Sequence, residues 1–479
     1  MSIQVVDFFE RTWEKEVKHI KACKDRKTGE IFETLFPKSF LSDFSQNLEF
    51  GVDCVGARFR DGVRETLSTM IEGQTSFDMV LQQGWTLQLH QPQRFNDNLW
   101  RLISSLEAEF GSLVGCNAYI TPGDGSQGLA PHYDDVSIFC CQVYGTKNWS
   151  IHRANPCLAN HPSGDLEGST LGKPYMEVQL EPGDILYLPR GTIHQASTND
   201  SQSTHLTISF LQNWAYVDLL AKSLEACTVL PPLQLPLPDS LKKSFHSIDN
   251  VAVLMSNLSK CCEDLISYVN SKAGIDMVTN GLNAMKFDFM QHRLPPHPAQ
   301  IIDKGPIPSI NDEIVLLGNF FHVFKDLSGD MKTESRGDGS VDVSFGDGYD
   351  FRVMSSVYNS RKHHMMPSGS EDCCAQGTCE HPHSHASETS GSEDHDDSKD
   401  NDDSEEYDSS EEDEEEQDQS SMLLPQCFES VLQQVFSGTP VRVIDLIIDH
   451  DQRKIDIART FHDFGLCRTI PKGSKKRKH

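Results

Sequence analysis

The spacing of apolar residues changes several times along the chain. Near the start, the stretches VRETLSTMIEG (63–73) and DNLWRLISSLEAEFG (97–111) carry apolar residues three and four positions apart, which predicts helices. Between residues 111 and 213, runs such as HYDDVSIFCCQVYG, MEVQLEPGD and STHLTISFL are separated by Gly, Pro and Asp. This alternation of short strand signals and turn residues is typical of a β-sandwich or barrel.

The helical period returns after this region. VDLLAKSLEACTVL, VAVLMSNLSKCCEDLISYVN and GLNAMKFDFMQHRL predict a helical domain over residues 214–295. Strand signals follow in IVLLGNFFHVF and VDVSFG, and two short helices precede a strand-like end in PQCFESVLQQVF and KIDIARTFHDFGLCRTI. We therefore expect residues 296–360 and 421–470 to form one winged-helix-like C-terminal domain.

A strongly acidic segment lies between these two parts of the C-terminal domain. Residues 361–420 have few apolar side chains, and between Glu388 and Asp418 there are 18 acidic residues against one lysine, which supply most of the net charge of −29. Such a composition predicts a disordered acidic insert. It can act as a solubilising spacer or attract basic partners. The insert also holds a Cys/His cluster over residues 373–385, whose spacing matches no closed zinc pattern, so metal binding there stays open.

The chain shows no sign of membrane insertion or export. No apolar stretch approaches the roughly 18 residues that cross a bilayer, and charges follow the N-terminus too early for a signal peptide. The 14 cysteines have no regular framework, so we expect free thiols in a reducing compartment. The basic tail, residues 471–479, can be a nuclear import signal, a weak nucleic-acid contact or a solvated end. We expect a nuclear protein.

One pair of polar residues indicates chemistry. In LAPHYDDVSIF, His132 and Asp134 are two positions apart, so on a strand both side chains would face the inside of a barrel. Two imidazoles and one carboxylate that occupy one face of the coordination octahedron of iron leave its other positions open for oxygen and a substrate. LEPGDILYLPRGTIHQAS supplies the missing imidazole at His194, after an apolar strand and a Pro-x-Gly turn. Satisfied polar residues at strand ends would not explain this order.

An iron site of this kind is usually paired with 2-oxoglutarate, whose distal carboxylate needs a cation inside the barrel. Lys147, in GTKNW, follows on the next strand and is our candidate, although a lysine at a strand start is more often solvated. Polar residues on the flanking strands could hydrogen-bond the cosubstrate or serve structure alone. They are Asn117, Tyr119, Thr207 and Ser209.

These motifs together resemble a known family. NAYITPGDGSQGLAPHYDDV, YGTKNW, PGDILYLPRGTIHQA and STHLTIS, with FFERTWEKEVKHIKA near the start, are similar to the ribosomal oxygenases of the JmjC class over about residues 5–215. The resemblance implies an α+β protein in which a double-stranded β-helix (a jelly-roll, cupin-like JmjC barrel) spans residues 1–213. A helical dimerisation domain and a winged-helix-like domain follow it.

The resemblance also implies function. It makes His132, Asp134 and His194 the Fe(II) ligands and Lys147 the 2-oxoglutarate contact, with Asn117, Tyr119 and Ser209 as further contacts. The expected reaction is hydroxylation of a histidine in a large-subunit ribosomal protein. Lysine demethylation of histone H3 would use the same cofactors. The resemblance further implies a homodimer and a nucleolar location.

A different class of function remains possible from the sequence. A non-catalytic scaffold with a barrel and a winged helix would bind chromatin or ribosomes, but it would have no use for an open iron face. We expect no strong nucleic-acid binding, because PVRVIDLIIDHDQ is too acidic for a helix that contacts phosphates.

Overall fold

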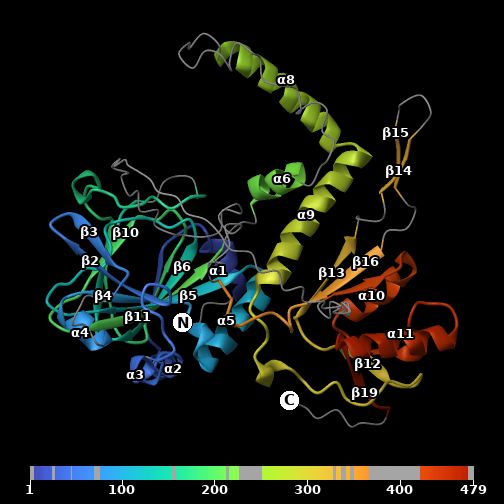
Figure 1. The fold of residues 1–479 in the computed structure, drawn as a ribbon, viewed down its shortest axis with the longest axis horizontal. Helices are drawn as coiled ribbons and strands as arrows, with labels where there is room; N and C mark the ends of the chain where they lie inside the picture. The colour runs from blue at the N-terminus through green and yellow to red at the C-terminus, as the bar shows by residue number, and fades with distance from the viewer. Residues whose placement is uncertain are drawn as a thin grey trace, which may run out of the picture.

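The computed structural model describes a barrel, a set of long helices and a C-terminal part (Figure 1). The described residues are 5–23, 27–44, 46–69, 76–153, 158–211, 215–225, 251–326, 331–335, 341–345, 350–365 and 421–472. The acidic insert was expected to begin at residue 361, but residues 361–365 are described and contact the barrel through Arg361 and His364. The rest of the expected insert, residues 366–420 with the Cys/His cluster, and the basic tail from residue 473 lie outside the described residues.

The largest sheet of the described residues has eight antiparallel strands, in the order β1-β9-β6-β11-β5-β4-β2-β3. Its strands are β1 (Lys18–Ile20), β2 (Cys54–Arg60), β3 (Val63–Leu67), β4 (Thr86–His90), β5 (Val114–Thr121), β6 (Ser137–Tyr144), β9 (Ile185–Leu188) and β11 (Ser203–Phe210). A second sheet, in the order β10-β7-β8, contains β7 (Lys147–Ile151), β8 (Met176–Leu180) and β10 (His194–Ser197).

The two sheets pack face to face. One buried cluster joins Ile138 of β6 and Leu188 of β9 to Trp149 of β7 and Leu180 of β8, so side chains from both sheets share one core. The chain thus alternates between two antiparallel sheets, which is the jelly-roll arrangement expected from the sequence.

Alternation along the central strands separates the two faces of the main sheet. On β5 and β11, Cys116, Ala118 and Leu206 pack into the larger hydrophobic core, under the helices that cover the outer face. The residues between them face the inside of the barrel, because successive strand side chains point to opposite faces. The helices of this region are α1 (Val5–Arg11), α2 (Thr28–Leu35), α3 (Phe40–Phe44), α4 (Phe77–Gln82) and α5 (Asp97–Phe110).

The prediction of a helix over residues 63–73 is wrong. Residues 63–67 form β3, which pairs with β2 across a tight turn. Asp61 and Gly62 both have positive φ (53° and 79°), which is the backbone that a two-residue hairpin turn requires. The Asp-Gly turn signal outweighs the helical spacing of the apolar residues. By contrast, the helix expected over 97–111 is confirmed as α5.

Three helices follow the barrel: α6 (Tyr216–Glu225), α8 (Val251–Val269) and α9 (Lys272–His292). Helix α9 runs from the C-terminal part past α6, and α8 projects away from the rest of the molecule (Figure 1). Gly281 of α9 lies so close to α6 that a Cβ atom there would collide with Ser223. No helix among the described residues is long and apolar enough to cross a membrane.

The C-terminal part holds the remaining elements. They are β12 (Glu313–Leu316), β13 (Phe321–Asp326), β14 (Met331–Ser335), β15 (Val341–Phe345), β16 (Asp350–Ser355), β17 (Ser421–Leu424), α10 (Glu429–Phe436), β18 (Val441–Arg442), α11 (Asp451–Phe464) and β19 (Cys467–Ile470). One core joins Ile314 and Val353 to Val431 and Phe461, so the segments on either side of the acidic insert fold together. The winged-helix assignment stays a prediction.

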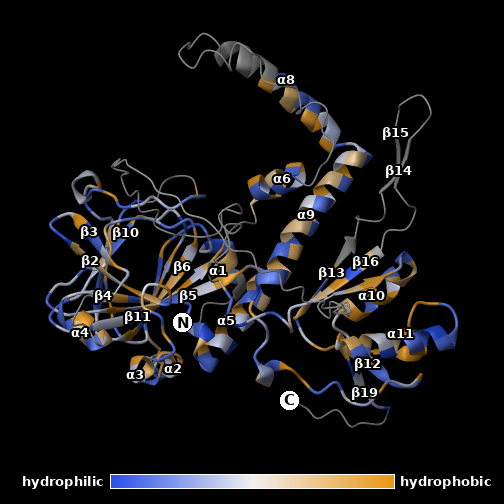
Figure 2. Cartoon of the chain, viewed as in Figure 1, coloured by the Kyte–Doolittle hydropathy of each residue, from blue (hydrophilic) through white to orange (hydrophobic). Residues whose placement is uncertain are grey.

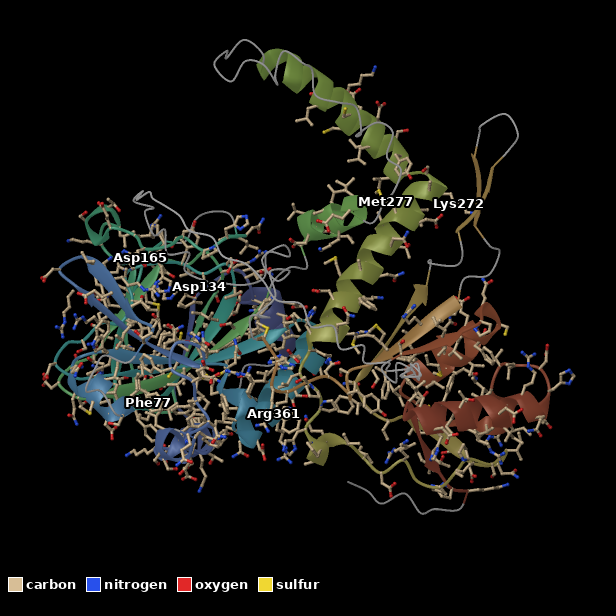
Figure 3. The ribbon with its side chains drawn as sticks, in the orientation of Figure 1. Phe77, Asp134, Asp165, Lys272, Met277 and Arg361 are labelled. Carbon is tan, nitrogen blue, oxygen red and sulfur yellow. The ribbon has the colours of Figure 1, made fainter. Side chains whose placement is uncertain are left out.

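A short segment after β16, residues 357–365, ties this part to the barrel. Arg361 donates to Asp97 of α5 at 2.8 Å and stacks over Trp100 (Figure 3). His364 Nε2 lies 2.9 Å from Glu107 Oε1, and both side chains are completely buried. Glu107 also accepts from the backbone N–H groups of Val114 and Leu294. The barrel, the end of α9 and the C-terminal part therefore meet at one buried carboxylate.

Candidate metal centre

His132 and His194 lie opposite each other inside the barrel. Their backbones form a two-residue antiparallel bridge, with N···O distances of 3.1 and 2.8 Å. His194 begins β10, and His132 lies in the loop between β5 and β6. The bridge brings together two residues that are far apart in the sequence, and their ring centroids are 4.5 Å apart.

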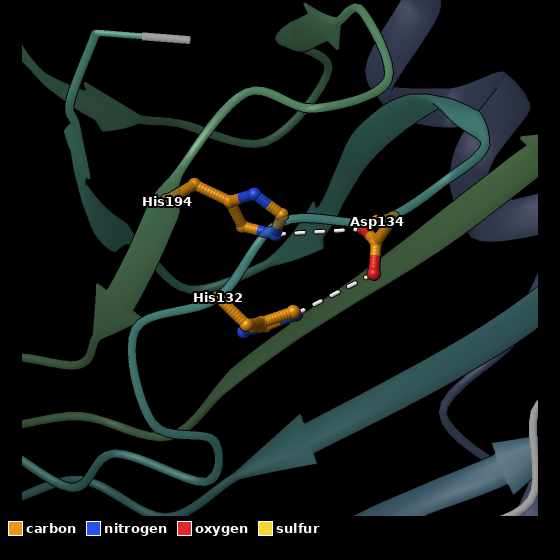
Figure 4. A group of neighbouring side chains, drawn as sticks. All are labelled: His132, Asp134 and His194. Carbon is orange, nitrogen blue, oxygen red and sulfur yellow. Dashed lines mark ion pairs between the residues drawn. The ribbon is translucent and has the colours of Figure 1, made fainter. Parts of the chain in front are cut away.

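Asp134 completes the group (Figure 4). Its two carboxylate oxygens lie 3.6 Å from Nε2 of His132 and 3.8 Å from Nε2 of His194. One ligand atom from each of the three residues lies within 4.8 Å of the other two. Asp134 is in the interior of the barrel (Figure 3) but it is not on a strand, contrary to the expectation for the His-x-Asp pair. It lies in the loop just before β6.

The loop still holds Asp134 in place. The N–H of Gly191 donates to the carbonyl oxygen of Asp134 at 2.7 Å. Gly191 has φ of 81°, a conformation that side chains with a Cβ rarely adopt. The Pro-x-Gly turn before His194 therefore positions the carboxylate as well as the histidine, which explains why this turn accompanies the site.

Both imidazoles are oriented for metal binding. Nδ1 of His132 is 2.8 Å from the carbonyl oxygen of Ala130, and Nδ1 of His194 is 2.9 Å from that of Thr192. Because a carbonyl oxygen only accepts, each Nδ1 carries the proton and each Nε2 keeps its lone pair, directed toward Asp134. Burial, reinforced by His132 and opposed by Asp134, lowers the pKa of His194 to about 4, which keeps this ring neutral near pH 7.

Lys147 lies in the same cavity as the three residues. The cavity, about 680 Å³ with its open mouth included, is bounded by both sheets. The Lys147 ammonium is buried and donates to Thr121 Oγ1 at 2.7 Å, and it has no acidic partner among the described residues. Burial lowers the pKa of Lys147 to about 7. A buried cation without an acid is costly unless a ligand supplies the negative charge.

The other residues selected from the sequence also line this cavity. They are Asn117, Tyr119, Thr207 and Ser209. Each lies on the inner face of β5 or β11, and Thr207 and Asn117 are direct register partners. Asn117 Oδ1 is buried and has no hydrogen-bond partner within the described ranges. The structure therefore brings all the selected residues together, and their individual roles stay predictions.

Among the lining residues that were not selected from the sequence are two with aromatic rings. His205 lies on the same face of β11 as Thr207 and Ser209. Trp149 lies on the same face of β7 as Lys147. The alternation that pointed to their neighbours could have found both.

A family model for the JmjC domain matches residues 88–219, which include all the cavity residues selected from the sequence. Ribosomal oxygenase 2 of Bos taurus is 33% identical over 389 residues, which cover 77% of this chain and 78% of the relative. A Dictyostelium discoideum protein named "Bifunctional lysine-specific demethylase and histidyl-hydroxylase NO66" is 36% identical over 229 residues, covering 46% of this chain and 43% of the relative.

Among solved structures, the chain is similar to the ribosomal oxygenase YcfD from Escherichia coli, in complex with cobalt and 2-oxoglutarate. The two are 16% identical over 72% of this chain and 86% of that one, with a TM-score of 0.35.

Proposed function

Because the chain belongs to the JmjC ribosomal oxygenase family, we propose that it hydroxylates a histidine side chain of a large-subunit ribosomal protein, using Fe(II) and 2-oxoglutarate. The observation that carries the proposal is the pairing, within one cavity, of a two-histidine, one-carboxylate group with a buried lysine that has no acid among the described residues. A purely structural site would need neither.

The side chains that line the cavity fit both Fe(II) and 2-oxoglutarate. His132, Asp134 and His194 would hold Fe(II) through two imidazole Nε2 atoms and a carboxylate, a donor set that suits iron and leaves coordination positions open. Bound iron and 2-oxoglutarate together supply the activation of O₂. The Lys147 ammonium and Thr121 hydroxyl would hold the distal carboxylate, and Asn117, Tyr119 and Ser209 are our further candidates for cosubstrate contacts.

The register of β7 shows how far Lys147 lies from the metal ligands along the barrel. Ile151 pairs with His194 at the metal end, and Lys147 lies four residues away along the same strand. Four residues of strand span about 13 Å. Lys147 and the metal ligands therefore line opposite ends of one cavity, as a dicarboxylate held at both ends requires. The rings of Tyr119, Trp149 and His205 form part of the wall of this cavity.

The test is mass spectrometry of histidine-containing peptides from large-subunit ribosomal proteins, incubated with the full chain, Fe(II), 2-oxoglutarate and O₂. We expect one added oxygen on a histidine, and no product from Asp134→Ala. Asp165→Ala is the matched control, because Asp165 is a partly exposed carboxylate on the same barrel (Figure 3). No modified histidine in any such peptide, from a protein that binds both cofactors, would contradict the proposed substrate.

Lysine demethylation is the second candidate, favoured by the name of the Dictyostelium relative. The same assay on methylated histone H3 peptides distinguishes it, because demethylation removes a methyl group from lysine. The non-catalytic scaffold is the alternative if neither peptide class reacts and 2-oxoglutarate does not bind.

We also propose that two copies associate through the helices after the barrel. Apolar residues recur along α6, α8 and α9 (Figure 2). Large apolar side chains there are exposed to solvent, which is unusual for a monomer unless the surface is an interface. They are Tyr216, Val217, Leu220, Leu258, Ile266 and Ile275. The nuclear and nucleolar location stays a proposal that rests on the family and the basic tail.

A further inference from the structure

We infer that His205 is a cosubstrate-binding residue whose imidazole donates a hydrogen bond to the carboxylate that Lys147 holds. The inference rests on the proposed function, because it concerns the same cavity and the same cosubstrate. It adds a neutral donor beside the lysine and gives the histidine of STHLTIS a role.

The strand register places His205 between the two ends of the cavity. Along β5 and β11 the inward-facing pairs are Thr121 with Ser203, then Tyr119 with His205, then Asn117 with Thr207. Lys147 reaches across from the second sheet to Thr121, in the first of these rows. His205 is in the next row toward the metal, about 6.6 Å along the strand.

The ring of His205 is held in one orientation. It stacks on Tyr119 with a centroid separation of 4.9 Å and an interplanar angle of 7°. Trp149 meets it edge to face at 5.4 Å from the opposite sheet. These contacts leave little freedom to rotate, so a donor on this ring is positioned before any ligand arrives.

The ring is neutral and has one proton to donate. Burial, then Lys147, then His194 lower the pKa of His205 well below 6.5. Nδ1 of His205 is enclosed, and it finds no hydrogen-bond partner in the part of the chain that the structure describes. An enclosed N–H without an acceptor is costly, so the proton belongs on Nε2, where a cavity ligand can accept it. A neutral donor adds direction to carboxylate binding without placing a second cation next to Lys147.

A purely structural histidine would behave differently from a donor. If His205 only fills space, its replacement should affect every ligand of the cavity alike. If it donates to the distal carboxylate, its replacement should weaken only ligands that carry that carboxylate. 2-Oxoglutarate and 2-oxopentanoate separate the two cases, because they share the metal-binding end and the five-carbon chain and differ at the distal carboxylate.

The experiment measures binding of both ligands to the full chain by calorimetry, with Mn(II) replacing Fe(II) so that no turnover occurs. His205→Phe keeps a stacked ring without a donor, His205→Asn has a donor that is too short to replace Nε2, and His205→Gln can place an N–H near the Nε2 position. We expect His205→Phe and His205→Asn to bind 2-oxoglutarate roughly tenfold to a hundredfold more weakly than wild type, the range for a hydrogen bond to a charged group. His205→Gln should restore most of the affinity, and 2-oxopentanoate binding should stay within about twofold in all three variants.

His152→Phe is the matched control. His152 is as buried as His205, and its ring nitrogens have no hydrogen-bond partner among the described residues. Unlike His205, it does not line the cavity. This control should bind both ligands as wild type does.

The possible outcomes separate the inference from the proposed function. Equal weakening of both ligands, or unchanged 2-oxoglutarate affinity in His205→Asn, would overturn the role of His205 while leaving the oxygenase intact. Absence of 2-oxoglutarate binding to the wild-type chain with Mn(II) would instead overturn the proposed function. If His205→Phe fails to fold, the comparison of His205→Asn with His205→Gln still decides the question, because both retain a polar side chain.

Discussion

Replacing Lys147 by methionine should stabilise the protein in the absence of ligands and weaken its use of 2-oxoglutarate. Methionine has a similar length and no charge. The folded protein lowers the pKa of Lys147 from 10.5 to about 7 because the side chain is buried. This difference means that the protonated lysine costs up to about 5 kcal/mol of folding free energy, at about 1.4 kcal/mol for each tenfold change in the protonation equilibrium.

The folded and unfolded pKa values of Lys147 determine how the stability of the protein changes with pH. Below about pH 7 both the folded and the unfolded chain hold the Lys147 proton, so the full cost is present. Between about pH 7 and 10.5 only the unfolded chain holds it, so the stability of the wild type rises with pH. The advantage of Lys147→Met should therefore be largest at pH 6 and about 3 kcal/mol smaller at pH 9.

The assay is denaturant unfolding of the two full-length proteins, with a metal chelator present, at several pH values between 6 and 9. The difference between wild type and Lys147→Met isolates the contribution of the lysine from all other titrating groups. Adding Mn(II) and 2-oxoglutarate should stabilise the wild type more than the variant, by mass action. A variant that is less stable than wild type at pH 6, or a difference that does not change with pH, would refute the description of Lys147 as an unpaired buried cation.

Lys147→Ala should raise the 2-oxoglutarate concentration needed for half-maximal turnover at least about tenfold, since it removes a contact of roughly 1.5–3 kcal/mol; an unchanged requirement would move the role to another residue. His132→Ala, Asp134→Ala and His194→Ala should each abolish turnover while circular dichroism shows an unchanged fold, and full activity in any of them would remove the metal assignment. Ile266→Asp, on the exposed part of α8, should convert a dimer to a monomer in sedimentation at micromolar concentration, and a wild type that is already a clean monomer would contradict the dimer. Deleting residues 388–418 should leave turnover of short neutral peptides and of basic full-length substrates unchanged if the insert only solubilises; a loss with the basic protein alone that salt suppresses would show recruitment instead.

The sequence indicated the barrel and the candidate site because both depend on local patterns. Strand alternation with turn residues predicted the sheets between residues 111 and 213, and the residue types of His132, Asp134 and His194 pointed to the metal site without any spatial information. The structure adds the reason why the three meet, which is a backbone bridge between His132 and His194. A contact between residues so far apart in the sequence leaves no periodic signal.

Where the sequence-based predictions differ from the structure, the differences have physical causes. At residues 63–67, two positive-φ turn residues, Asp61 and Gly62, decided between helix and strand, although the apolar spacing favoured a helix. Asp134 was expected on a strand because its side chain had to face inward, yet a hydrogen bond from Gly191 positions it from a loop. Strand alternation could have placed His205 on the inner face of the barrel, but the function that we infer for it depends on the side chains that surround it, which the sequence does not show.

The buried carboxylate of Glu107 bears on how the chain unfolds. It lies on α5, yet its partners come from the start of β5, from the end of α9 and, through His364, from the segment after β16. Loss of the distant partners would leave a charged group in an apolar interior with too few hydrogen bonds, which is among the most costly defects that a folded protein can carry. The barrel and the segment from β16 to His364 should therefore melt as one cooperative unit, and a barrel expressed without the C-terminal part would lose stability even though every residue that lines its cavity is still present.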